Sequence, residues 1–169
     1  LQVIDTPFPA PVIHGRPDPK NAQTLLAGLR LATAGCLEGR YAGLVTAPLA
    51  KSVIADSGVP FTGHTEFLAE LTGVELPVML LVAGDLRVAL ASTHLPLREV
   101  PDFITQDRLT RVLQILHDDL KSKFGIEAPE IIVCGLNPHA GESGHLGKEE
   151  EAVIAPVIRA LAQKGMRVR

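Results

Sequence analysis

The chain has 169 residues, a formal net charge of −3 and a hydrophobic content of 46%, values typical of one globular α/β domain with a real core. Lysine and arginine are scattered rather than clustered, so the charge pattern excludes a basic binding surface and we expect no nucleic-acid partner. No run reaches the roughly 18 consecutive apolar residues of a membrane span and no signal peptide is visible, so we expect no membrane partner and a cytoplasmic location.

Aliphatic residues must supply most of the core, because tryptophan is absent and aromatic residues make up only 4% of the chain. The two cysteines, Cys36 and Cys134, lie in apolar contexts, where a free cysteine packs as a small hydrophobic side chain. We therefore expect both cysteines to be buried and reduced, with neither in a disulfide or a metal site.

The first part of the chain alternates strand-like and helix-like patterns. Leucines at helical spacing predict an amphipathic helix, and glycines and prolines mark the loops between elements. In chain order, the sequence predicts a strand end over residues 1–5, a proline-rich loop over 7–19, helices over 21–38, 49–57 and 64–71, and a short buried strand over 43–47.

The next elements are a hairpin and a long helix. Two apolar runs, 77–83 and 86–92, flank a Gly-Asp turn and predict the hairpin. The clearest helix of the chain covers residues 105–124, where apolar residues form one buried stripe that includes Phe124. Gly125 is placed to end this helix, because glycine readily adopts the left-handed conformation of a helix stop.

The last elements are a strand over 131–134, a helix over 148–164 and a strand that opens at residue 166. The helix begins with three glutamates at 149–151, and negative charge in a first turn suits the helix dipole. Because the final strand only opens before the sequence stops, we expect the chain to be a piece of a longer protein.

The most informative segment is the run G-L-N-P-H-A-G-E at residues 135–142, which follows the strand predicted over 131–134. A strand end that feeds a glycine-rich loop before a helix is where α/β sheets present groups to a ligand. The loop carries the amide of Asn137, the imidazole of His139 and the carboxylate of Glu142. We interpret this cluster as a functional site.

A second histidine, His94, directly follows an apolar strand-like run and could bind a metal together with His139. Imidazole suits Zn, Fe, Co or Mn, although a hydrogen-bonded structural histidine is the alternative reading of His94. A catalytic zinc site usually has a third protein ligand, and the sequence offers no convincing one. We expect Glu142 to hydrogen-bond a ring nitrogen or the substrate rather than to bind metal.

His64 and Thr65 lie at the start of a predicted helix, where free N–H groups and the positive dipole end favour a phosphate or a carboxylate. The alternative is that Thr62 or Thr65 only caps the helix. Lys51 at the start of the preceding helix could pair with a substrate anion, and its alternative is a solvated lysine. Position alone leaves both pairs of readings open.

Three stretches together resemble the 4-hydroxythreonine-4-phosphate dehydrogenase family of vitamin B6 biosynthesis. They are L-V-T-A-P through F-T-G-H-T-E-F (44–67), T-H-L-P-L (93–97) and G-L-N-P-H-A-G-E (135–142). The resemblance runs from about Gly15 to the end of the chain. It implies an α/β fold with helix, sheet and helix layers, similar to the isocitrate/isopropylmalate dehydrogenases. It also implies that residues 1–169 are the central segment of a longer two-lobed enzyme whose N-terminal and C-terminal parts are missing.

The resemblance implies roles for individual residues. His64 and Thr65 would bind the substrate, and His94 and His139 would ligate a divalent metal such as Zn, Mg, Co or Mn. The family's third metal ligand is a downstream histidine that this sequence does not contain, so we expect the fragment alone to be inactive. Three polar side chains are expected to support the site: Lys51, Asn137 and Glu142.

The resemblance implies oxidation of 4-phosphohydroxy-L-threonine, a small phosphorylated hydroxy acid, by hydride transfer to NAD or NADP. The resulting β-keto acid then loses CO₂, and the metal stabilises the oxyanion that develops on the alcohol oxygen. Members of the family are homodimers with the active site at the subunit interface. Two alternatives stay open: a related dehydrogenase of four-carbon sugar-acid phosphates or cyclic diol carboxylates, and a metal-binding module without catalysis.

Overall fold

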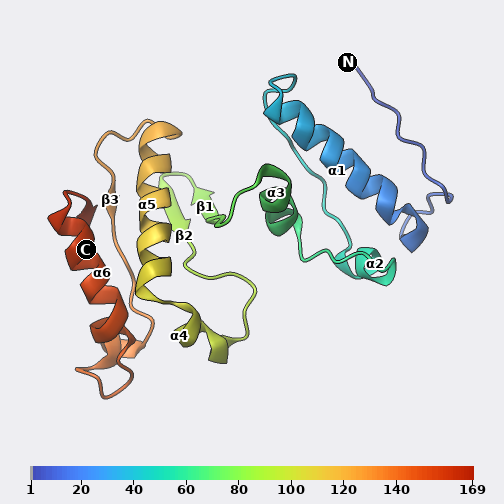
Figure 1. Cartoon of the computed structure of the whole chain (residues 1–169). Helices are drawn as coiled ribbons and strands as arrows, with labels where there is room; N and C mark the ends of the chain where they lie inside the picture. Colours follow the sequence, from blue (N-terminus) through green and yellow to red (C-terminus); the bar gives the residue numbers. More distant parts are fainter. Residues whose placement is uncertain (1) are drawn as a thin grey trace. The chain divides into compact units, whose positions relative to one another are not determined.

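The computed structural model describes residues 2–169. Its contacts divide the chain into two compact units, Leu1–Pro77 and Val78–Arg169, and each unit has its own hydrophobic core. The described residues form both helices and strands (Figure 1), which is consistent with the predicted α/β class. No helix within residues 2–169 is long and apolar enough to cross a membrane.

The first unit is built from helices at the predicted places. They are α1 (Ala22–Leu37), which follows a 3-10 turn at Pro19–Asn21, α2 (Lys51–Asp56) and α3 (His64–Thr72). Gly73 ends α3 in the left-handed conformation at φ 69°. The buried core of this unit joins side chains from all three helices and from the loop before α3: Ala22, Leu26, Ile54, Phe61 and Phe67.

A buried asparagine fixes the proline-rich loop that precedes α1. The Ala10 N–H donates to Asn21 Oδ1 at 2.9 Å, and Asn21 Nδ2 donates to the Ala10 carbonyl at 3.1 Å. Both polar groups of the side chain are thereby satisfied away from water, as a buried amide requires. This reciprocal pair ties the loop predicted over residues 7–19 to the helix that follows it.

Two strands predicted in the first unit are wrong. Residues 2–5 and 43–47 have no regular structure, and Val3 and Val45 are 80% and 98% exposed. A strand forms only where a neighbouring strand pairs its N–H and C=O groups. Unit 1 contains no strand among its described residues, so these apolar runs find no partner. Leu1, the first residue of the predicted strand end, lies outside the described residues.

The second unit begins with the predicted hairpin. Strands β1 (Leu80–Ala83) and β2 (Leu86–Ala89) pair antiparallel, with Ala83 opposite Leu86 across a tight turn. Gly84 takes a positive φ of 57° in that turn. A 3-10 turn at Leu97–Glu99 and the short helix α4 (Val100–Phe103) lead from the hairpin to α5.

Helix α5 (Gln106–Ser122) confirms the strongest helix prediction. The Thr105 hydroxyl caps it by accepting a hydrogen bond from the Arg108 N–H at 3.2 Å. Gly125 follows its end with φ 67°. Phe124, which the predicted stripe included, is 43% exposed because it lies beyond the last helical turn, so that part of the prediction is wrong.

Strands β3 (Glu130–Ile131) and β4 (Arg167–Val168) pair in parallel. Between them in the chain lie a π-helical turn at Glu150–Ile154 and helix α6 (Ala155–Gln163). Pairing continues past β3, because the Val133 N–H donates to the Arg169 carbonyl at 2.8 Å. The core of the unit joins both helices to the inward strand residues: Leu109, Leu113, Leu120, Ile131, Ile154, Val157, Leu161 and Val168.

From Ile131 onward, the side chains alternate between the face covered by the helices and the opposite face. Ile131 is 7% exposed and Ile132 is 65% exposed. Cys134 falls on the same side of this alternation as Ile132 and is exposed, so its predicted burial is wrong. Cys36 in α1 is partly buried, and both cysteines are free, as predicted.

Candidate functional site

The loop that follows β3 has an unusual backbone. His139 and Ala140 adopt left-handed conformations at φ 52° and 51°, within the 3-10 turn Pro138–Gly141. Glu142 and Ser143 are also left-handed, at φ 45° and 57°. A residue with a side chain pays roughly 1–2 kcal/mol for this conformation, so the surrounding structure must hold it in place.

A buried carboxylate, that of Glu150, binds the start of this loop. Its Oε1 atom accepts hydrogen bonds from the Leu136 N–H at 2.8 Å and the Asn137 N–H at 2.7 Å. Its Oε2 atom accepts one from Asn137 Nδ2 at 3.0 Å, and Glu149 Oε2 accepts another from the same nitrogen at 2.7 Å. Glu150 is only 9% exposed, so its charge depends on these donors.

These donors set the protonation state of Glu150. The Asn137 side-chain amide is the main cause that holds the pKa of Glu150 below its usual value, and the Asn137 backbone N–H adds to it. Burial acts in the opposite direction and is outweighed. Glu150 is therefore a carboxylate at neutral pH and acts as a hydrogen-bond acceptor.

The glycines of the loop leave room for this carboxylate. A Cβ atom on Gly141 would lie 2.7 Å from the Gly147 carbonyl oxygen and 3.0 Å from Glu150 Oε2. A Cβ atom on Gly147 would overlap the Asn137 side chain. These glycines are needed because the loop closes tightly around the Glu150 carboxylate and the Asn137 side chain.

In this loop His139 and Glu142 are exposed, and Asn137 is partly buried. His94 lies in the same unit, after β2, and is also exposed with a left-handed backbone at φ 54°. Within residues 2–169, neither the His94 ring nor the His139 ring makes a hydrogen bond or an ion pair. The described residues contain no group of three or more histidine, cysteine or acidic side chains that could hold a metal.

In the first unit, His64 and Thr65 begin α3, as the sequence predicted. The residue that caps the helix is Gly63, and no side chain makes a capping hydrogen bond. The reading in which Thr62 or Thr65 only caps the helix is therefore wrong. The His64 ring packs edge-on against Phe61 at 6.0 Å between ring centroids, which orients the imidazole.

Two buried polar atoms at this helix start lack a hydrogen-bond partner: His64 Nε2 and Glu66 Oε2. Lys51 in α2 reaches the same place, because a Cβ atom on Gly63 would lie 3.2 Å from Lys51 Nζ and 3.1 Å from Glu66 Oε2. The first unit thus gathers an imidazole, an ammonium group and a carboxylate around the start of α3. Unsatisfied buried polar atoms are costly, and a polar ligand would satisfy them.

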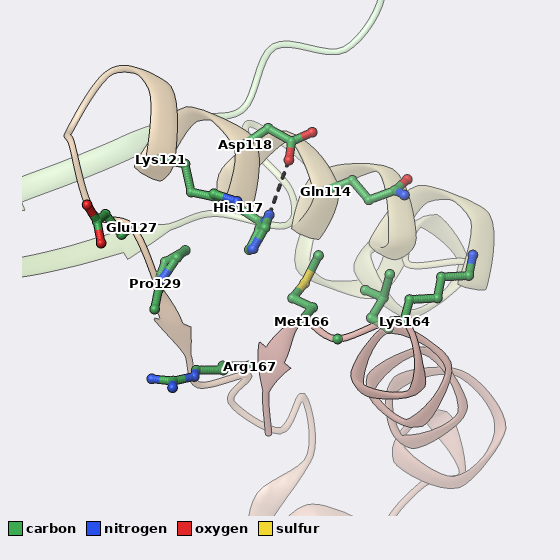
Figure 2. Close-up of a pocket in the computed structure, with 12 residues that line it drawn as sticks. Gln114, His117, Asp118, Lys121, Glu127, Pro129, Lys164, Met166 and Arg167 are labelled. Carbon is green, nitrogen blue, oxygen red and sulfur yellow. Dashed lines mark hydrogen bonds and ion pairs between the residues drawn. The ribbon is translucent and has the colours of Figure 1, made fainter.

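A cavity of about 410 Å³ lies elsewhere in the second unit (Figure 2). Its walls come from the second half of α5 and from the segments that precede β3 and β4, and they include His117, Glu127 and Arg167. His117 Nδ1 lies 3.1 Å from Asp118 Oδ1 at its rim. None of the predicted site residues lines this cavity. The cavity lies at the amino ends of strands β3 and β4, whereas the 135–147 loop follows the carboxyl end of β3.

The sequence missed Glu150 as a site residue. In the sequence Glu150 is one of three glutamates in the first turn of a predicted helix, where negative charge interacts favourably with the helix dipole. Glu149 and Glu151 fit that pattern equally well. The glycines at 141 and 147 gave a second signal, because they imply a close approach by another group. Sequence alone does not say which of the three glutamates approaches.

Comparison with known proteins relates the chain to one biosynthetic family. The family model described as pyridoxal phosphate biosynthetic protein PdxA matches residues 1–169. A 4-hydroxythreonine-4-phosphate dehydrogenase from Pseudomonas syringae pv. tomato is 57% identical over 169 residues, which are 100% of this chain and 51% of that protein. The chain thus spans about half the length of the curated relatives it matches.

Two solved structures of dehydrogenases are similar to this chain in fold. The crystal structure of a 4-hydroxythreonine-4-phosphate dehydrogenase from Klebsiella pneumoniae matches with a TM-score of 0.81 and 37% identity, over 90% of this chain and 46% of that one. A terephthalate 1,2-cis-dihydrodiol dehydrogenase from Burkholderia xenovorans LB400 matches with a TM-score of 0.66 and 27% identity, over 98% of this chain and 53% of that one.

Proposed function

The chain belongs to the PdxA family of pyridoxal phosphate biosynthetic proteins, and on this premise we propose that the complete protein is a 4-hydroxythreonine-4-phosphate dehydrogenase. It oxidises 4-phosphohydroxy-L-threonine with NAD or NADP, and decarboxylation follows, in the cytoplasm. The observation that carries the proposal is the 57% identity to a dehydrogenase of that name over the full length of this chain.

We propose that the working enzyme is a longer, two-lobed protein of which these residues are the central segment. The relatives support this, because the chain spans about half of their length. Apolar side chains left in contact with water support it as well, among them Val45 at 98% and Ile132 at 65% exposed. Further chain that covers such residues would bury apolar area worth roughly 25 cal/mol per Å².

For the substrate, we propose that His64 and Thr65 bind its polar groups and that Lys51 pairs with its negative charge. The His64 Nε2 atom, buried and without a partner, supports this assignment. Lys51 Nζ lies beside Gly63 at the same helix start, where N–H groups and the dipole favour an anion. These contacts would fix the alcohol carbon relative to the nicotinamide ring, since hydride transfer needs both in line.

We propose that His94 and His139 hold a divalent metal ion (Zn, Mg, Co or Mn) with a ligand from beyond this segment. Two exposed imidazoles without protein partners suit such an ion as a donor set. When bound, the ion supplies Lewis-acid stabilisation of negative charge on the substrate alcohol oxygen. In this proposal the carboxylate of Glu142, which is exposed, accepts a hydrogen bond from a ring nitrogen or from the substrate.

We also propose that the enzyme is a homodimer with its active site at the subunit interface. The β1–β2 hairpin supports this, because it exposes four large apolar side chains: Leu81 at 54%, Val82 at 53%, Leu86 at 64% and Val88 at 42%. By the strand pairing, Leu81, Leu86 and Val88 share one face of the hairpin, and an exposed apolar face favours association with another chain.

A second candidate keeps the scaffold and changes the substrate. The likeness to the terephthalate dihydrodiol dehydrogenase supports a cyclic diol carboxylate, and a four-carbon sugar-acid phosphate is the other related substrate. Its identity of 27%, against 57% for the first candidate's relative, places it second.

The test is reduction of NAD or NADP by the full-length gene product with each of the three substrate classes, before and after chelation of divalent metal. We expect turnover with 4-phosphohydroxy-L-threonine that chelation abolishes and added metal restores. Turnover only with a diol carboxylate or a sugar-acid phosphate would support the second candidate. A folded, metal-loaded protein that turns over none of them would support a binding module instead.

A further inference from the structure

Glu150 stands out among the buried groups of the second unit because the proposed chemistry does not use it. It is 9% exposed, and a buried carboxylate persists only where donors compensate for lost water. Its three donors all come from Leu136 and Asn137, 14 and 13 residues earlier in the chain. The carboxylate therefore joins the start of the 135–147 loop to the start of the helix that follows it.

The segment closed by this contact is the one that carries His139. Asn137 adopts an extended conformation, with φ −95° and ψ 154°, and the left-handed residues begin two positions later. The Oε2 atom of Glu150 also lies close to Gly141, on the other side of His139. One carboxylate thus contacts the backbone before the histidine and packs against the backbone after it.

We propose that Glu150 is a positioning residue, which through Asn137 and the 136–137 backbone sets the turn that presents His139 to a divalent metal ion. The proposal rests on the proposed function, since it takes His139 as a metal ligand. The turn needs such support, because His139 and Ala140 hold left-handed conformations that cost free energy. Without the carboxylate, the loop would relax toward ordinary conformations and the imidazole would leave its binding position.

The test measures binding of Co²⁺ alone to the full-length protein, followed by its visible absorption. Glu150→Gln keeps one oxygen for the two backbone N–H groups but places an NH₂ group against Asn137 Nδ2. Asn137→Ala removes the side-chain link and leaves the backbone bonds. We expect each variant to weaken Co²⁺ binding by about tenfold to hundredfold, the usual cost of losing a partner that orients a ligand.

Glu151→Gln is the matched control, because Glu151 is the exposed neighbour of Glu150 in the same turn. We expect it to bind Co²⁺ like wild type. If Glu150 acts through Asn137, the loss of affinity in the double variant should be smaller than the sum of the two single losses, since both changes remove the hydrogen bond between Asn137 Nδ2 and Glu150 Oε2. Circular dichroism and thermal unfolding without metal identify folded variants, and affinities are measured well below their melting temperatures.

Wild-type Co²⁺ affinity in folded Glu150→Gln would overturn the proposal, and so would additive losses in the double variant. If Glu150→Gln does not fold, Asn137→Ala decides: a weakened site supports the proposal, and wild-type affinity overturns it. His139→Ala separates this outcome from failure of the proposed function. Unchanged Co²⁺ binding in His139→Ala would overturn the ligand assignment, and the positioning role with it.

Discussion

His64 and Glu150 show two opposite conditions of a buried polar atom. The Nε2 atom of His64 has no partner in the part of the chain that the structure describes, whereas the Glu150 carboxylate accepts hydrogen bonds at both oxygens. An unsatisfied buried atom costs free energy in the absence of a ligand, and a satisfied one stabilises the fold. The first condition is typical of a binding residue and the second of a structural support.

Replacing His64 by alanine should therefore weaken substrate binding, with a loss of stability limited to about 1 kcal/mol from the edge contact with Phe61. We expect KM of the full-length enzyme for 4-phosphohydroxy-L-threonine to rise about tenfold to hundredfold, the value of a hydrogen bond to a charged group, with a smaller change in kcat. His14→Ala is the control, because His14 is an exposed histidine of the same unit. An unchanged KM in His64→Ala would show that the residue does not contact substrate.

Glu150 should make stability depend on pH. Its hydrogen bonds in the folded state hold its pKa below the ordinary value of 4.5, so its contribution is fully present above that pH and is lost as the pH falls through the folded pKa. We expect the melting temperature of wild type to fall more steeply below pH 4.5 than that of Glu150→Gln, which has no group to titrate. Parallel curves for the two proteins would contradict this.

The two residues also differ in how far they could be predicted from sequence. His64 stood out because a helix start offers an anion site whatever the rest of the fold does. The role of Glu150 depends on donors 13 and 14 residues away, across a loop whose path no local pattern determines. A sequence pattern therefore identifies a functional residue when the role depends on neighbouring residues, as for His64, and misses it when the role depends on distant ones, as for Glu150.

The same distinction holds for the elements. Helix α5 was predicted nearly to its ends, because its cap, its apolar stripe and its glycine stop all lie within the helix and its flanks. The hairpin was predicted for the same reason, since its two strands are neighbours in sequence. The strand expected over residues 43–47 failed because a strand needs a partner that its own residues do not specify.

Helix α5 gives a test of this local control. Thr105→Ala removes the hydroxyl that accepts from the Arg108 N–H, and the loss of such a cap costs about 1 kcal/mol. We expect urea unfolding of the full-length protein to show that loss without a change in the slope against urea. Thr110→Ala is the control, because its hydroxyl donates to the Gln106 carbonyl within the helix and caps nothing. Equal losses in both variants would mean that the cap contributes nothing specific.

At the scale of the whole molecule, the sequence and the structure describe a segment that carries candidate site residues in both of its compact units. The substrate residues His64 and Thr65 belong to the first unit, and the candidate metal ligands His94 and His139 to the second. The described residues contain no complete metal-binding group of three. On the proposed function, the metal ion needs a further ligand from outside this segment, and a second subunit is one proposed source.

The hairpin provides the test of that dependence. Leu86→Glu places a charge on its exposed apolar surface, which a second subunit would have to bury unpaired, at a cost of several kcal/mol. We expect the full-length variant to dissociate into monomers in sedimentation experiments at concentrations where wild type is a dimer, and its turnover to fall in parallel. Leu37→Glu is a closely matched control, because Leu37 is also 64% exposed and lies at the end of α1 rather than on the hairpin. A Leu86→Glu dimer as stable as wild type would exclude the hairpin from the interface, whereas active monomers would separate catalysis from dimer formation.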